Sequence, residues 1–233
     1  MMQTKISRII AFCLLLVALT SCAPRISPED ERREALSQVS MLVDRYGEYS
    51  SPALRSYLSY LSGRLLSGLP EKWRPKYDYS FVVLDTSEPL AYSAGSGIIV
   101  FSRGLVTSLG AEAELAFALA HEIAHQQLGH PRLLIENYRN GSSSEREKKM
   151  ELEADRQAAG IVALAGYDPR YAVTALVNLY RRAGRVAGAS THPELRERIA
   201  ALKAAIRDSG WQPPGTINRR AFVELQMELR RAG

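Results

Sequence analysis

The chain has 233 residues, which is enough for one domain of ordinary size with a buried core. Hydrophobic residues make up 46% of it and charged residues 24%, a composition that excludes an intrinsically disordered chain. The formal net charge of +5 is spread along the sequence as arginines beside acidic residues, and such a pattern predicts no nucleic-acid partner.

The N-terminal segment has the pattern of a bacterial lipoprotein signal peptide. A short basic start precedes an apolar run from Ile9 to Leu19, which is shorter than the roughly 18 residues that a membrane-spanning helix needs. Small residues then lead to Cys22, which resembles a lipobox, where the chain is cut before the cysteine and the thiol is lipidated. We expect residues 1–21 to be a signal peptide and residues 22–233 to be the mature domain. An ordinary signal peptide with an incidental cysteine is the alternative.

A lipid such as palmitate on Cys22 predicts membrane attachment without a spanning helix. Ala23 and Pro24 lack the aspartate that retains similar lipoproteins in the inner membrane, so the resemblance favours the outer membrane, with the domain facing the periplasm. Cys13, the other cysteine, lies in the signal peptide, and no disulfide is expected in the mature chain.

The mature chain begins with two predicted helices, over residues 28–46 and 52–67. Each starts with a serine before a proline, which combines a capping side chain with the residue preferred at the first helical position. The second helix carries an apolar face at helical spacing. That face consists of Leu54, Tyr57, Leu58, Leu61 and Leu65.

The next part of the chain changes to a strand pattern. Tyr79 to Asp85 is rich in β-branched and aromatic residues and predicts a strand. Ala91 to Phe101 has the glycine pair Gly95 and Gly97 between two short extended runs, which predicts a hairpin. No strand pattern follows Phe101, so the sheet is expected to be small, with at least one open edge.

The remainder of the chain is predicted to be helical. Helices are expected over residues 111–129, 147–165, 168–183, 191–207 and 218–231, with a polar interruption over residues 139–149. The expected fold is therefore a single α+β domain that is mostly helical and has a small sheet.

The sequence His121-Glu122-Ile123-Ala124-His125 within the helix at 111–129 carries the functional prediction. Residues four apart share a helix face, so both imidazoles can bind one zinc ion. Glu122 lies about 100° round the helix from His121 and can act as a catalytic base beside the metal. Because the flanking residues are apolar, the helix is expected to be buried, and its polar side chains then need partners.

A catalytic zinc site needs a third protein ligand, and His130 is one alternative. The metzincin pattern has a glycine three residues and a histidine six residues after the second ligand. Leu128 and Pro131 occupy those positions, so this pattern is absent. His130 is therefore interpreted as a residue that caps or packs at the end of the helix.

Glu151 is the preferred third ligand. It shares a helix face with Asp155, whereas Glu153 points nearly opposite. One acid on that face can bind zinc while the other accepts a hydrogen bond from a ligand histidine. Taken alone, this charged stretch is typical of a solvated helix face. It is interpreted as part of the metal site because it lies on the next helix after His125.

Four motifs in order resemble the HtpX-like and CAAX-prenyl-protease-like zinc metallopeptidases, a gluzincin family, and especially its periplasmic members of the BepA and LoiP type. The motifs are SGIIVFSRGLV at Ser96–Val106, HEIAH at His121–His125, ELEADRQAAG at Glu151–Gly160 and STHPELRERIAAL at Ser190–Leu202. Residues 90–97, which lie just before and within the predicted hairpin, differ from the usual family sequence. This departure affects the details of the expected substrate strand, not the metal ligands.

The resemblance implies roles for several residues. Glu151 is implied to be the third ligand of one zinc ion per chain, with Asp155 behind it. His192 is implied to lie near the metal, and in some family members this histidine takes the position of the bound water and keeps the enzyme latent. Arg198 matches a family arginine whose role we interpret as structural.

The expected function is a zinc metalloendopeptidase of the cell envelope that cleaves unfolded or misassembled proteins. Extended polypeptide is expected to add as a strand along the residues that follow the second glycine. These residues are Ile98, Ile99, Val100 and Phe101. A latent or non-cleaving zinc lipoprotein that binds assembly clients is the alternative. No oligomeric state is predicted.

Overall fold

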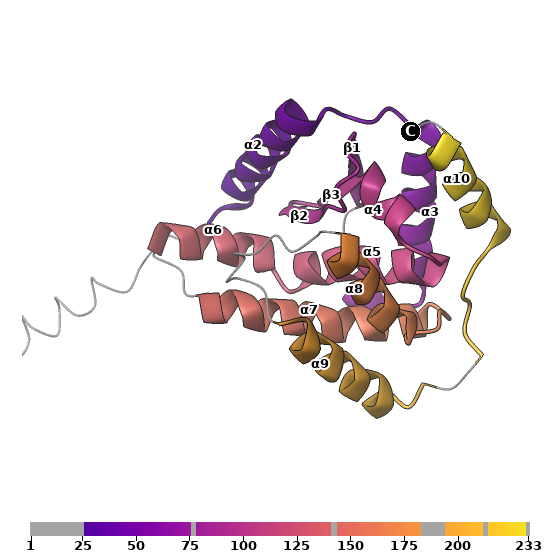
Figure 1. Ribbon diagram of the computed structural model, residues 1–233. Coiled ribbons are helices and arrows are strands. Elements are labelled where there is room, and N and C mark those ends of the chain that lie inside the picture. Colours follow the sequence, from indigo (N-terminus) through magenta and orange to yellow (C-terminus); the bar gives the residue numbers. More distant parts are fainter. Residues whose placement is uncertain (1–25, 76–77, 141–143, 183–193, 212–213, 232–233) are drawn as a thin grey trace, which may run out of the picture.

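The computed structural model describes residues 26–75, 78–140, 144–182, 194–211 and 214–231. Most of these residues are helical, and three strands form one small sheet (Figure 1). The elements are α2 (Pro28–Tyr46), α3 (Pro52–Ser67), the short 3-10 helix η1 (Glu71–Trp73), β1 (Ser80–Leu84), β2 (Ala91–Gly95), β3 (Ile98–Ser102), α4 (Arg103–Ser108), α5 (Glu112–Gln127), α6 (His130–Asn140), α7 (Ser144–Leu164), α8 (Tyr171–Arg182), α9 (Leu195–Asp208) and α10 (Arg220–Arg231). The predicted α+β class is confirmed.

The first two helices have the predicted bounds, and their caps explain why. The hydroxyl of Ser27 accepts a hydrogen bond from the backbone N–H of Asp30, and the hydroxyl of Ser51 accepts one from Leu54. Each bond satisfies a donor that the first turn of a helix leaves without a partner. The predicted apolar face of α3 is buried in the main core.

The sheet has the strand order β1-β3-β2, which corrects the prediction for the substrate strand. Ile98, Ile99, Val100 and Phe101 lie on β3, which pairs in parallel with β1 and antiparallel with β2. Because both edges of β3 are already paired, these residues cannot receive an added strand. The hairpin was predicted correctly, but the strand before it pairs with the second strand of the hairpin rather than the first.

The outer edges of the sheet differ in how they are covered. Beside β1, the backbone N–H of Tyr49 donates to the carbonyl of Val83 at 2.7 Å, and that of Asp85 donates to Gly47 at 3.0 Å. Among the residues that the structure describes, no strand pairs with the outer edge of β2. The open edge of the sheet is therefore that of β2.

Helix α5 occupies the middle of the molecule, between the sheet and α7 (Figure 1). It packs against α7, α8, α3 and β2, and nearly all its residues are buried. The alanines at positions 113, 116, 118, 120 and 124 allow this close approach, because their short side chains bring neighbouring elements near to the helix backbone. None of the described helices is long and apolar enough to cross a membrane.

The segment after α5 differs from the prediction. The polar interruption was expected over residues 139–149, but α6 extends to Asn140 and α7 begins at Ser144, before the predicted start at residue 147. Helix α6 itself was not predicted. Its separate start follows Gly129, whose φ of 70° ends the path of α5.

Candidate metal centre

The two histidines of the HEIAH motif lie side by side on the buried face of α5, as predicted. His121 and His125 are each 9% exposed, and their Nε2 atoms are 3.0 Å apart. The spacing of four residues brings both rings over the same turn of the helix. Phe117, one turn before, packs against the ring of His121 with the ring centroids 6.2 Å apart.

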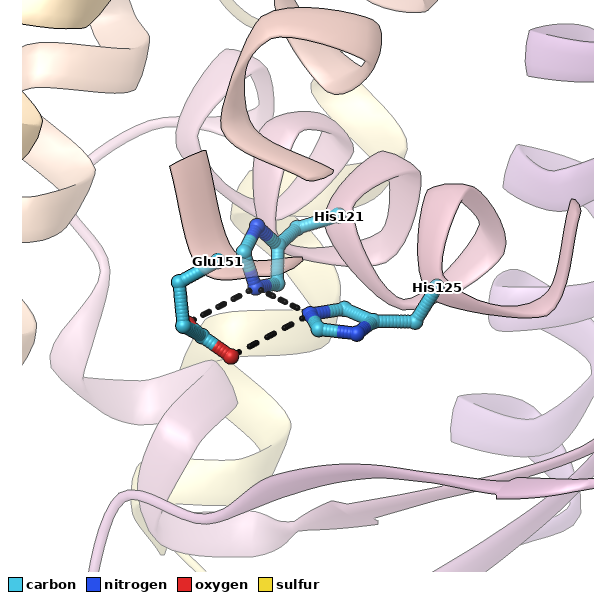
Figure 2. Close-up of side chains that lie close together, drawn as sticks. All are labelled: His121, His125 and Glu151. Atoms are coloured by element: carbon cyan, nitrogen blue, oxygen red, sulfur yellow. Dashed lines mark hydrogen bonds and ion pairs between the residues drawn. The ribbon is translucent and has the colours of Figure 1, made fainter. Parts of the chain in front are cut away.

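Glu151 completes a cluster of three ligand-type side chains. Its carboxylate oxygens lie 3.5 Å from Nε2 of His121 and 3.4 Å from Nε2 of His125. Figure 2 shows the two rings and the carboxylate converging from two helices, α5 and α7. One donor atom from each of the three residues lies within 4.8 Å of the others, so the cluster could hold a metal ion.

A second layer of charged groups stands behind Glu151 and His121. Asp155, fully buried one turn further along α7, has Oδ1 at 3.1 Å from Nδ1 of His121. Arg198 from α9 donates to both oxygens of Asp155, at 2.7 and 2.8 Å, and its Nη1 lies 3.3 Å from Glu151. Burial raises the pKa of the Asp155 carboxyl, but the hydrogen bonds from Arg198 and His121 outweigh this and lower it.

The other ligand-type histidine, His125, has a different neighbour. Its Nδ1 lies 3.0 Å from Nδ1 of His130, the first residue of α6. The Nε2 of His130 lies 3.5 Å from Oε2 of Glu153 on α7. His130 therefore does pack at the end of α5, as predicted, but it packs against a candidate metal ligand. This contact was not predicted from the sequence, in which Glu153 was expected to point nearly opposite to Glu151 and Asp155.

Glu122 and a cleft lie beside the three ligand-type residues. Glu122 is 7% exposed and lines a cleft of about 420 Å³ together with His121 and His125. One wall of this cleft comes from β2, through Ala91, Tyr92 and Ser93. Further walls come from α6 and α8. The cleft thus joins the candidate base, the ligand-type cluster and the open edge of the sheet.

The electrostatics of the cluster fit a cation. Burial alone would lower the pKa of His121, but the carboxylates of Asp155 and Glu151 raise it to about 10. For His125, burial outweighs Glu151 and the pKa is lowered. Burial and the neighbouring His125 also lower the pKa of His130, to about 4. Positive charge is therefore favoured between Glu151 and Asp155, and two imidazoles with one carboxylate are a donor set that zinc prefers.

Two predicted site residues lie outside the described part of the chain. Cys22 is in the segment before residue 26, and His192 is in the segment between residues 182 and 194. The lipid anchor and the fourth-ligand role stay predictions. Arg198, close to His192 in sequence, contacts Glu151.

Comparisons with known proteins agree with this geometry. Residues 64–143 match the model of peptidase family M48, and residues 104–210 match Peptidase U49. The chain is 29% identical over 153 residues to the mitochondrial metalloendopeptidase OMA1 of Arabidopsis thaliana. That match covers 54% of this chain and 32% of the relative, so the chain spans about a third of that protein's length. Together these partial matches support a metallopeptidase of the M48 type.

Proposed function

We propose that this protein is a zinc-dependent endopeptidase that cleaves extended segments of unfolded or misassembled proteins. The observation that carries the proposal is the convergence of His121, His125 and Glu151 within 4.8 Å, with Glu122 lining the adjoining cleft. A zinc ion held by these three residues would polarise a bound water and a scissile carbonyl. The similarity to a metalloendopeptidase supports the same reaction.

Glu122 is the proposed general base. It follows His121 directly on α5, so its carboxylate lies beside the cluster rather than within it, as a base for a water molecule must. A carboxylate in this position can take a proton from the attacking water and deliver it to the leaving amine. Its 7% exposure keeps the proton transfer away from bulk solvent.

The substrate is proposed to bind as an added strand along the outer edge of β2. Residues 91–93 on this strand line the same cleft as His121 and Glu122, so a polypeptide paired with them would pass the candidate metal. Pairing through the backbone tolerates many side chains, and it requires a segment that is extended and free of its own partners. Unfolded and misassembled proteins expose such segments.

The cellular setting remains the one predicted from the sequence. Within the M48-type peptidases, the motifs at residues 96–106, 151–160 and 190–202 favour the periplasmic BepA and LoiP branch. The lipobox-like sequence at Cys22 supports a lipoprotein of the outer membrane that acts in protein quality control. Mass spectrometry of the mature N-terminus tests the lipid, and only a peptide starting at lipidated Cys22 supports it.

A Glu122→Gln variant tests the reaction. Loss of the base should lower the cleavage of unfolded casein by at least about 100-fold, while the protein keeps one zinc per chain. Glu147→Gln is the matched control, because Glu147 lines the same cleft and lies outside the ligand cluster. Cleavage by Glu122→Gln at the rate of the unchanged chain would contradict the proposed mechanism.

A further inference from the structure

His130 occupies a position that its spacing from His125 on a helix does not explain. Five residues along one continuous helix would turn a side chain about 140° away from His125. Gly129, with φ of 70°, instead ends α5 and starts α6 in a new direction. The turn brings His130 back against the last turn of α5, where its ring lies edge-on to that of His125 with centroids 4.9 Å apart.

The contact joins the ring nitrogens that face away from the ligand cluster. Nε2 of His125 faces His121 and Glu151, whereas its Nδ1 lies 3.0 Å from Nδ1 of His130. His130 is 1% exposed, so water cannot readily replace either partner. At this distance one of the two nitrogens carries a proton and the other accepts it.

Only one direction of this hydrogen bond is compatible with a bound metal. If His130 donated, the neutral ring of His125 would carry its own proton on Nε2, where the metal needs a lone pair. If His125 donates from Nδ1, its Nε2 is free to bind. Glu153 favours this second direction, because its carboxylate lies 3.5 Å from Nε2 of His130 and stabilises a proton there.

We propose that His130 is a positioning residue that accepts the Nδ1 proton of His125 and so holds the ligand ring in its metal-binding tautomer and orientation. Glu153, through Nε2 of His130, selects the accepting form of His130. The proposal rests on the proposed metal site. In this role His130 supports the ring of His125 at its Nδ1, just as Asp155 supports the ring of His121 at its Nδ1.

Two substitutions at position 130 separate this role from packing. His130→Asn retains a side-chain oxygen acceptor near the position of Nδ1, whereas His130→Phe retains a ring of similar size without an acceptor. Zinc affinity, measured by competition with a chromophoric chelator, should fall about 10- to 100-fold for His130→Phe and much less for His130→Asn. Glu153→Gln should give a smaller decrease than His130→Phe. Denaturation of the metal-free proteins tests whether each variant folds.

The ring nitrogens of the unchanged protein give a second readout that needs no variant. Nitrogen NMR of the zinc-bound full chain should show a protonated Nδ1 on His125 and an unprotonated Nδ1 on His130. The opposite assignment would overturn the proposal, as would equal loss of affinity in the Phe and Asn variants. Two zinc ions per unchanged chain but one per His130→Phe chain would also overturn it, since His130 would then be a ligand.

The same measurements separate this proposal from the proposed function. If His130→Phe binds zinc as tightly as the unchanged chain, the positioning role fails while the zinc site and cleavage by it stand. If the unchanged chain binds no zinc, the metal site fails, and the positioning role fails with it.

Discussion

Arg198 is the residue on which the charge balance behind the candidate metal site depends. It donates two hydrogen bonds to Asp155 and contacts Glu151, and its own side chain is 9% exposed. Asp155 has no exposed surface, so its charge is stabilised almost entirely by Arg198 and His121. A buried carboxylate that loses its partner costs far more than a broken ion pair at the surface.

Arg198→Met should therefore destabilise the metal-free protein by about 3 to 5 kcal/mol in urea denaturation. Arg198→Lys keeps the charge but loses the paired donors, and its effect should be smaller. Arg196→Met is the matched control, because Arg196 is exposed on the same helix, α9. Similar effects of the Met substitutions at 196 and 198 would show that the buried ion pair contributes little.

At this scale the sequence predicted the residues whose relation is set by one helix. The spacing of four residues placed His121 beside His125, and the same spacing placed both Glu151 and Asp155 against His121. The contact between His125 and His130 was not predictable in this way, because it depends on a turn between two helices. Gly129 and the nearby Pro131 were the local signals of that turn.

At the scale of elements, Gly129 determines where α5 ends. Its φ of 70° lies in the left-handed region, which other residues adopt at a cost, and a Cβ added there would meet no atom within 4 Å. The effect of a substitution is therefore one of backbone conformation rather than of crowding. The same turn places His130 against His125, so the backbone conformation at Gly129 affects a residue that contacts a candidate metal ligand.

Gly129→Ala should destabilise the protein by about 1 to 2 kcal/mol in thermal or urea denaturation. Gly129→Asn should cost less, since asparagine adopts the left-handed region more readily. Gly63→Ala serves as the control. Gly63 lies inside α3 with nothing within 4 Å of an added Cβ, and alanine there should stabilise by about 0.5 to 1 kcal/mol. The same sign for both alanine variants would contradict this account of Gly129.

The order of the strands marks the limit of prediction at this scale. A glycine pair between two extended runs identified the hairpin of β2 and β3, because its two strands are adjacent in sequence. Strand β1 pairs with β3 rather than with β2. This pairing joins strands that are not adjacent in sequence, so the local spacing of residues does not predict it. The substrate strand was consequently assigned to the central strand rather than to the edge strand.

At the scale of the whole molecule, a buried carboxylate links the C-terminal segment to the helix that carries the site. Glu112, in the first turn of α5, has no exposed surface. It accepts hydrogen bonds from the hydroxyl of Tyr167 at 2.6 Å, and from the backbone N–H and Nη1 of Arg219 at 2.6 and 2.8 Å. The predicted start of this helix at residue 111 is consistent with Glu112 in its first turn, where the helix dipole favours an acid, but its distant partners were not predictable.

This link joins parts of the chain that are far apart in sequence. Asn218 accepts the N–H of Glu112 at 2.7 Å, and Ile217 accepts that of Ala113 at 2.9 Å. The segment before α10 therefore satisfies donors that the first turn of α5 leaves open. Because α5 also carries His121 and His125, the C-terminal segment supports the helix that carries the site.

Arg219→Met removes the positive charge opposite Glu112 and should destabilise the protein by about 3 kcal/mol in urea denaturation, because the carboxylate remains buried. Glu112→Gln added to Arg219→Met should recover part of that loss, since the remaining side chain is neutral. Arg220→Met is the matched control, because the Arg220 side chain is 93% exposed and its pair with Glu224 lies at the surface. Folded Arg219→Met protein should bind zinc as the unchanged chain does, because Arg219 and Glu112 are not among the candidate metal ligands. If Glu112→Gln destabilises both backgrounds equally, the ion pair is not what holds the C-terminal segment to α5.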